Sequence, residues 1–187
     1  YSNPRVSFDN KYWYLSVGIE IEEKQEQLTD LSLGIDLGVS ELAICSDGTR
    51  YKNINKTRLV RKLEKKLRML QRQVSKKYLI NKEGGKFVKT SNIIKLEKKI
   101  QLLHRKIANI RKNYLHQVTT KIVKIKPFRV VIEDLNVKGM MKNRHLSKAI
   151  ANQGLYEFRR ILEYKCKFKG IELILADRFF PSSKMCS

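Results

Sequence analysis

Two acidic residues follow apolar runs at positions where a carboxylate is expensive to bury. Asp36 lies in "LSLGIDLG" and Glu133 in "FRVVIEDLNV". Burying a polar group without a partner costs about 2–7 kcal/mol. An unpaired carboxylate costs several kcal/mol as well, unless a cation or hydrogen bonds compensate for the lost water. Mg²⁺ is a hard cation held by one or two carboxylates and phosphate oxygens, and a pair of such ions promotes phosphodiester hydrolysis. Asp36 and Glu133 are therefore predicted to bind Mg²⁺ and to be catalytic.

Each acid also has a simpler interpretation. An aspartate before a glycine at a strand end can accept backbone N–H groups in a turn, which is an ordinary structural role for Asp36. Asp134 points away from Glu133 by strand alternation and is expected to cap the turn at "EDLN". The metal-site hypothesis therefore depends on the two strands being neighbours.

The elements that must position these acids alternate between strands and helices. Residues 1–23 are predicted to form a β-hairpin. Strands are then expected at 31–36, 41–46 and 50–53, as antiparallel neighbours around short turns. "FRVVIE" and "IELILAD" are typical of buried strands, and a helix at 146–169 should end at Gly170. With right-handed connections, this order predicts an α/β fold with a mixed sheet and helices on its faces.

A long basic helical hairpin separates the two groups of strands. Leucine and isoleucine recur at spacings of three and four on either side of "NKEGGKFVKTS", which predicts two amphipathic helices. Residues 56–126 carry 23 Lys or Arg and three acids, whereas the rest of the chain is nearly balanced. So concentrated a charge favours a polyanion partner over a solvated coiled coil or an anionic membrane surface. The expected nucleic-acid-binding residues are Arg61, Lys65, Arg68, Arg72, Lys98, Arg105 and Lys112.

Composition sets the outer limits. The 187 residues, 42% hydrophobic with net charge +22, suffice for one sizeable core, and no apolar run is long enough to cross a membrane. Three widely spaced cysteines do not form a disulfide framework, so a reducing, cytoplasmic location is expected. Cys45 and Cys166 are expected in the core. The chain starts at Tyr1 and stops at "KMCS", which suggests a piece of a longer protein.

Three motifs in order give the chain a family resemblance. "GIDLGVSELAICSDG", "VVIEDLNVKGMMKN" and "DRFFPSSKMCS", placed around a helical hairpin, resemble the TnpB family of insertion-sequence proteins. That resemblance implies an RNase H-like (RuvC-like) fold related to type V CRISPR effectors. It also implies an RNA-guided DNA endonuclease with a two-Mg²⁺ mechanism. Asp36 and Glu133 fall on the first two family carboxylates. The implied partners are DNA and guide RNA, and the implied location is prokaryotic and nucleoid-associated.

The resemblance also implies a domain plan. Residues 1–30 resemble the end of a wedge-type β module and its linker. Residues 31–180 would form the nuclease domain, with the basic hairpin inserted at 56–126. Residues 181–187 would begin a zinc-ribbon segment, to which Cys186 contributes the first ligand of a Zn²⁺ site that needs four.

Two departures from the family pattern matter. The family's third catalytic carboxylate lies after the zinc module, and this chain has no such position, because Asp177 comes too early in motif order. Cys186 alone cannot hold zinc. The chain as given is therefore expected to bind nucleic acid better than it cuts it, with the missing residues downstream of Ser187.

Two other classes remain open. "GIDLG" also occurs beside the ATP phosphates in actin-like and sugar-kinase ATPases, but those proteins need a second glycine-rich phosphate loop that is not recognisable here. The other alternative is a non-catalytic basic nucleic-acid-binding module whose carboxylates only cap turns.

Overall fold

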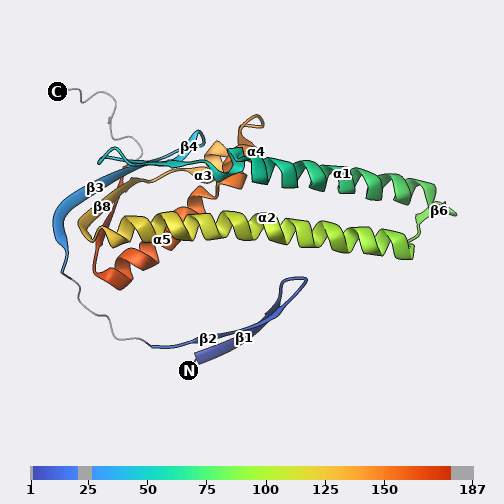
Figure 1. Cartoon of the computed structure of the whole chain (residues 1–187), viewed down its shortest axis with the longest axis horizontal. Coiled ribbons are helices and arrows are strands. Elements are labelled where there is room, and N and C mark those ends of the chain that lie inside the picture. Colours follow the sequence, from blue (N-terminus) through green and yellow to red (C-terminus); the bar gives the residue numbers. More distant parts are fainter. Residues whose placement is uncertain (1, 21–26, 178–187) are drawn as a thin grey trace. The chain divides into compact units, whose positions relative to one another are not determined.

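A computed structural model describes residues 2–20 and 27–177 of the chain. Its strands are β1 (Ser2–Phe8), β2 (Trp13–Gly18), β3 (Thr29–Leu37), β4 (Glu41–Cys45), β5 (Arg50–Lys52), β6 (Lys82–Glu83), β7 (Lys86–Phe87), β8 (Pro127–Glu133) and β9 (Glu172–Ala176). Its helices are η1 (Ile54–Lys56), α1 (Arg58–Ile80), α2 (Ser91–Lys124), α3 (Val137–Met140), α4 (Ser147–Gln153) and α5 (Leu155–Lys169) (Figure 1).

The chain divides into two compact units, and each has its own core. The hairpin unit contains residues 1–21 and 56–110, and the sheet unit contains residues 22–55 and 111–187. The boundary at Ile110 falls inside α2, so the last part of that helix belongs to the sheet unit.

A five-stranded mixed sheet organises the sheet unit. Its strand order is β5-β4-β3-β8-β9, in which β3–β4 and β4–β5 are antiparallel while β3–β8 and β8–β9 are parallel. This confirms the predicted mixed sheet and the predicted pairing of the first strand with the strand that ends at Glu133. The last part of α2, after Ile110, and α5 lie against this sheet (Figure 1).

One face of the sheet packs against α2 and α5. Leu33 and Ile35 of β3 and Ile132 of β8 are buried with Val118 of α2 and Phe158 of α5. Alternate residues of these strands turn to this face, as the period of two requires. Each fully buried side chain of this size contributes about 1.5–3 kcal/mol of hydrophobic stabilisation.

The predicted single helix at 146–169 is wrong, because the structure has two helices there. Gly154 has φ of 70° and ends α4 while it begins α5. A residue in the left-handed conformation cannot continue a right-handed helix, and glycine adopts this conformation at low cost. Gly170 ends α5 in the same way, as predicted, with φ of 69°.

The hairpin unit is thinner. Leu70 of α1 and Leu103 and Ile107 of α2 form a small buried cluster, flanked by half-buried leucines. Thr57 accepts the backbone N–H of Val60 and caps α1, and Thr90 accepts the N–H of Ile93 near the start of α2. The loop between the helices contains the short β6–β7 hairpin.

The β1–β2 hairpin has one apolar face. Val6 pairs with Leu15 and Phe8 with Trp13, and all four side chains are more than half exposed. The rings of Phe8 and Trp13 lie 4.8 Å apart between centroids. The predicted hairpin at the start of the chain is thus confirmed.

Candidate functional site

The structure brings Asp36 and Glu133 to neighbouring positions. Ile35 pairs with Ile132 across the parallel strands β3 and β8, so the next residues, Asp36 and Glu133, lie one step further along the same register. Neighbouring strands are about 4.8 Å apart, and paired residues of parallel strands point to the same face. Because Ile35 and Ile132 point into the core, the two carboxylates point to the opposite face.

The surroundings of the two acids leave them accessible. Asp36 is exposed and Glu133 is half-buried. Asp36 lines a cavity of about 450 Å³ together with Gly38, Val39, Ser40, Glu41, Ile44 and Arg50. The end of β3 therefore offers a carboxylate next to open space.

Glu41 is an acid in this cavity that the sequence reasoning missed. Its Oε2 atom is buried and accepts no hydrogen bond, and Nη1 of Arg50 lies 3.7 Å away, which is too long for one. The cation beside Glu41 in this structure is therefore the Arg50 guanidinium, which forms an ion pair with it. The signal was the short turn after Asp36, which returns the chain to the same end of the sheet.

No third ligand joins Asp36 and Glu133 among the residues that the structure describes. Within residues 2–20 and 27–177, no group of three or more His, Cys, Asp or Glu is placed to hold a metal. Asp177 follows Ala176, which pairs with Glu133, so its register position is beside Asp134. Asp134 accepts a 2.7 Å hydrogen bond from Arg159. Cys186, the expected zinc ligand, lies outside the described residues.

The two other cysteines are core residues, as predicted. Cys45 and Cys166 are free thiols that are buried in the sheet unit. Burial raises the pKa of Cys45 to about 11 and that of Cys166 to about 12. Both thiols are therefore protonated at neutral pH and are poor metal ligands.

Exposed positive charge gathers along α1. A groove of about 760 Å³ is lined by Lys62, Lys65, Lys66, Arg68, Met69, Arg72, Gln73 and Lys76. It has no acidic lining residue. Three of the four predicted α1 residues lie in it, and Arg61 is exposed on the same helix outside the groove. Sequence reasoning missed Lys62, Lys66 and Lys76, although their spacings of three and four from Lys65, Lys62 and Arg72 place them on one face.

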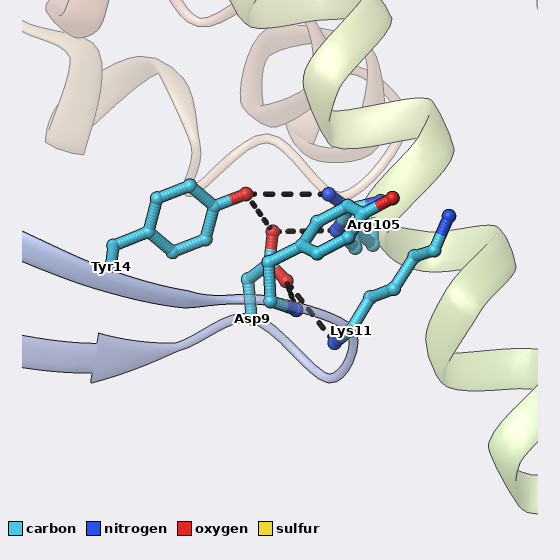
Figure 2. Close-up of polar contacts among 5 residues, drawn as sticks. Asp9, Lys11, Tyr14 and Arg105 are labelled. Atoms are coloured by element: carbon cyan, nitrogen blue, oxygen red, sulfur yellow. Dashed lines mark hydrogen bonds and ion pairs between the residues drawn. The ribbon is translucent and has the colours of Figure 1, made fainter.

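The predicted residues of α2 differ from one another. Lys98 and Lys112 are exposed. Arg105 is half-buried, because its Nε donates a 2.5 Å hydrogen bond to Asp9 of the β1–β2 turn and its Nη2 donates to the Tyr14 hydroxyl at 3.3 Å (Figure 2). The Arg105 guanidinium also lies 5.0 Å from the centre of the Tyr12 ring. Arg105 therefore has protein partners in this structure.

Asp9 is the centre of this contact. Partial desolvation acts to raise the pKa of Asp9. Hydrogen bonds from the Tyr14 hydroxyl, the Tyr12 backbone N–H and Arg105 outweigh it and hold the pKa well below its usual range. Figure 2 shows Tyr14 and Arg105 converging on Asp9. The turn thus presents an ionised carboxylate to α2 at neutral pH.

In the part of the chain that the structure describes, none of the helices combines the length and the apolar character that crossing a bilayer needs.

Comparisons with solved structures identify the fold. The chain superposes on a chain of "Cryo-EM structure of CRISPR-Cas12f Ternary Complex" with a TM-score of 0.56 and 22% identity, over 94% of this chain and 34% of that one. "Cryo-EM structure of the Cas12f1-sgRNA-target DNA complex" gives a TM-score of 0.55 and 23% identity, over 88% and 32%. The mixed α/β arrangement is therefore shared with the Cas12f proteins.

The chain is also similar in sequence to curated proteins. The chain is 35% identical over 174 residues to a "Putative RNA-guided DNA endonuclease" of Streptomyces pristinaespiralis, covering 93% of this chain and 40% of that protein. It is 36% identical over 198 residues to "Putative RNA-guided DNA endonuclease InsQ" of Escherichia coli (strain K12), covering 97% and 46%. The chain thus spans less than half the length of these curated relatives.

Two family models match along the chain. The "Cas12f1-like, TNB domain" model matches residues 156–187. The OrfB_IS605 "Probable transposase" model matches residues 16–144, which include Asp36, Glu133 and the whole basic hairpin. The resemblance to TnpB is confirmed, and the chain belongs to the OrfB_IS605 family of transposases.

Proposed function

We propose that this chain is part of an RNA-guided DNA endonuclease whose RNase H-like (RuvC-like) sheet holds Mg²⁺ through Asp36 and Glu133. The observation that carries the proposal is the register of β3 and β8, which sets the two carboxylates side by side at adjoining strand ends. Two neighbouring anions repel each other unless a cation lies between them. The relatives' names, read with this geometry, supply the nuclease class.

The residues present fit a hard divalent cation. Carboxylate oxygens are the ligands that Mg²⁺ prefers, and Asp36 opens onto a cavity in which the Glu41 carboxylate already has a cationic partner, Arg50, at 3.7 Å. When bound, such ions supply an activated water and stabilise the leaving oxygen of a phosphodiester. The role of this chain's residues is to hold the cation at a fixed place on the sheet, with open space beside it for a phosphate.

The groove on α1 is the proposed nucleic-acid interface. Its six cations, with no acid among the residues that line the groove, would bind phosphates of target DNA or guide RNA with little sequence preference. Met69, an apolar side chain that is 49% exposed in the middle of the groove, adds a surface against which sugar or base can pack. The Cas12f relative of known structure was solved with sgRNA and target DNA.

The proposal also assigns a role to Cys186. It would supply one ligand of a structural Zn²⁺ site whose other three ligands come from the remainder of the protein. The third catalytic carboxylate would come from the same remainder. We therefore expect the 187-residue chain to bind nucleic acid without cutting it efficiently.

Calorimetric titration of Mg²⁺ tests the metal site. The wild-type chain should bind Mg²⁺, and Asp36→Asn and Glu133→Gln should each abolish the binding, because each removes half of the carboxylate pair. Asp30→Asn, which neutralises an exposed acid on the same strand, should leave it unchanged. Equal binding by all four proteins would contradict the nuclease proposal and favour a non-catalytic binding module. Tight ATP binding by the wild type would favour the ATPase alternative.

A further inference from the structure

Two buried amide side chains hold the turn that follows Asp36. Asn53 and Gln153 are 7% and 3% exposed, and only Thr119 joins them as a buried polar residue among those that the structure describes. Burying an amide costs free energy unless hydrogen bonds replace its water, so the partners of such a side chain indicate its role.

Both amides donate to consecutive carbonyl groups of the β3–β4 turn. Nε2 of Gln153 donates to the Gly38 carbonyl at 3.0 Å, and Nδ2 of Asn53 donates to the Val39 carbonyl at 2.8 Å. Gln153 is the last residue of α4, 115 positions along the chain from Gly38. A distant helix end and the segment after β5 therefore meet at one turn.

Further hydrogen bonds fix the two amides themselves. The Asn55 backbone N–H donates to Asn53 Oδ1 at 2.8 Å, and Asn55 Nδ2 donates to Gln153 Oε1 at 3.3 Å and to the Asn152 carbonyl at 3.1 Å. Arg111 of α2 donates to Asn55 Oδ1 at 2.7 Å. These bonds set which end of each amide is oxygen and which is nitrogen. The donor ends of Gln153 and Asn53 must then face the turn.

The turn is held tightly on its other side as well. The Gly38 N–H donates to the Leu42 carbonyl at 3.3 Å, and a Cβ at Gly38 would lie 3.3 Å from the Glu41 carbonyl oxygen. Gly38 follows Asp36 by two residues, and Gly38, Val39 and Asp36 line the same cavity. A shift of this turn must therefore move the backbone from which the Asp36 carboxylate projects.

We infer that Gln153 and Asn53 are positioning residues for Asp36, which act through the Gly38 and Val39 carbonyls to fix the carboxylate toward its cation. This inference rests on the metal site proposed above. The oxygen of each amide accepts a hydrogen bond from Asn55, so the amides are assigned a positioning role and not that of a ligand. Loss of an outer hydrogen-bonding partner commonly lowers metal affinity 10- to 100-fold, which sets the scale of the expected effect.

Replacement of Gln153 by methionine is the sharpest test, because methionine keeps the length and removes both hydrogen bonds. The affinity for Mn²⁺, measured by electron paramagnetic resonance of the free ion, should fall roughly 10-fold or more in Gln153→Met. Asn55→Ala, which frees the Gln153 amide without touching the turn, should give a smaller fall and provides a milder variant if Gln153→Met folds poorly.

Thr119→Val is the matched control. Thr119 is also fully buried, and its hydroxyl donates to the Leu115 carbonyl within α2, away from the turn. Its loss should lower thermal stability without changing Mn²⁺ affinity. A similar loss of affinity in Thr119→Val and Gln153→Met would show a general stability effect and overturn the inference.

A second measurement needs no metal. In ¹H–¹⁵N spectra of the metal-free chain, Gln153→Met should shift the amide signals of Gly38 and Asp36, and Thr119→Val should not. If Asp36→Asn abolishes Mn²⁺ binding while Gln153→Met changes neither the affinity nor these signals, the positioning role is wrong and the metal site stands. If Asp36→Asn leaves Mn²⁺ binding intact, the metal-site proposal fails and the positioning role fails with it, even if the signals shift.

Discussion

The sheet unit and the hairpin unit differ in what they bury and what they expose. Among the described residues, the core of the sheet unit contains eighteen buried side chains, whereas the cluster of the hairpin unit contains three. The α1 groove, by contrast, concentrates six cations without an acid. A core with many buried side chains resists local unfolding, whereas a core with few of them unfolds locally more easily. The sheet unit thus fixes geometry, and the hairpin unit presents charge.

A cavity in each core tests this difference most strongly. Phe158→Ala removes a ring that is fully buried in the sheet unit and should lower the free energy of unfolding by about 3–5 kcal/mol. Leu103→Ala, at a side chain that is 8% exposed in the hairpin unit, should cost about 2 kcal/mol. Urea unfolding followed by circular dichroism measures both. Equal losses would mean that the two cores are comparably packed.

Removal of positive charge should weaken DNA binding more in the hairpin unit than in the sheet unit. Replacing Lys65, Arg68 and Arg72 with Gln keeps good helix formers on α1 and removes three groove cations. The slope of log affinity for duplex DNA against log salt concentration should flatten by about 0.9 for each phosphate contact that is lost. For three lost contacts, the affinity at 0.1 M salt should fall roughly 10²- to 10³-fold.

The matched control takes three exposed bases of the sheet unit. Lys142, Arg144 and Lys148 replaced by Gln should flatten the slope less, with unfolding unchanged in both triple variants. The same flattening in the two variants would remove the distinction between the units as charge-presenting surfaces.

Acid should loosen the contact between the β1–β2 turn and α2 inside the hairpin unit. The Asp9 pKa is lower folded than unfolded, so its contribution to stability is complete above the ordinary carboxyl value, about 3.9. That contribution is lost as the pH falls further toward the lowered folded pKa. Trp13, the single tryptophan, pairs with Phe8 directly beside the turn, and its fluorescence should report the change.

The Asp9→Asn variant should already show the altered Trp13 emission at pH 7, because the ionised partner of Arg105 is gone. Asp47→Asn, an exposed turn acid of the sheet unit, should behave like the wild type. If the emission of Asp9→Asn at pH 7 matched that of the wild type, the Asp9 contact would not hold the turn.

The smallest expected effect concerns the break between α4 and α5. Gly154→Ala must adopt φ near 70° and place its Cβ 3.3 Å from Leu115 Cδ1, so it should destabilise the sheet unit by about 1–2 kcal/mol. Gly170→Ala has the same backbone strain with no neighbour within 4 Å and should cost slightly less. Thermal unfolding separates the two. A smaller loss of stability in Gly154→Ala than in Gly170→Ala would show that the Leu115 side chain moves aside without cost.

Much of the fold could be predicted because its signals are local. Apolar runs bounded by short turns predicted β3 and β4, a β-branched apolar run predicted β8, and apolar residues at helical spacing predicted α1 and α2. Gly154 was missed as a helix break because an isolated glycine is often tolerated inside a helix, and only the backbone shows its left-handed conformation. The two-residue strands β6 and β7 carry too little pattern to be predicted.

The candidate site was predictable only in part, for a related reason. Asp36 and Glu133 stand at strand ends that the sequence marks, so their proximity follows once the strands are paired. Gln153 and Asn53 carry no such mark, because their positions beside the turn depend on tertiary contacts. Glu41 could have been found from the short turn after Asp36. Arg105 has the same sequence character as Lys98, yet its ion pair with Asp9 joins residues 96 positions apart.

The pairing of β3 with β8 also has a consequence for how the molecule assembles. Ile35 and Ile132 are separated by the entire helical hairpin, so their contact closes a long loop, whereas Leu70 and Leu103 meet across a short one. Contacts of high sequence separation form slowly, and helical hairpins form quickly. We therefore expect pulse-labelling hydrogen exchange to protect the Leu103 amide before that of Ile132. During synthesis, Asp36 would therefore leave the ribosome before the whole helical hairpin and Glu133 are made, and the two carboxylates could meet only afterwards.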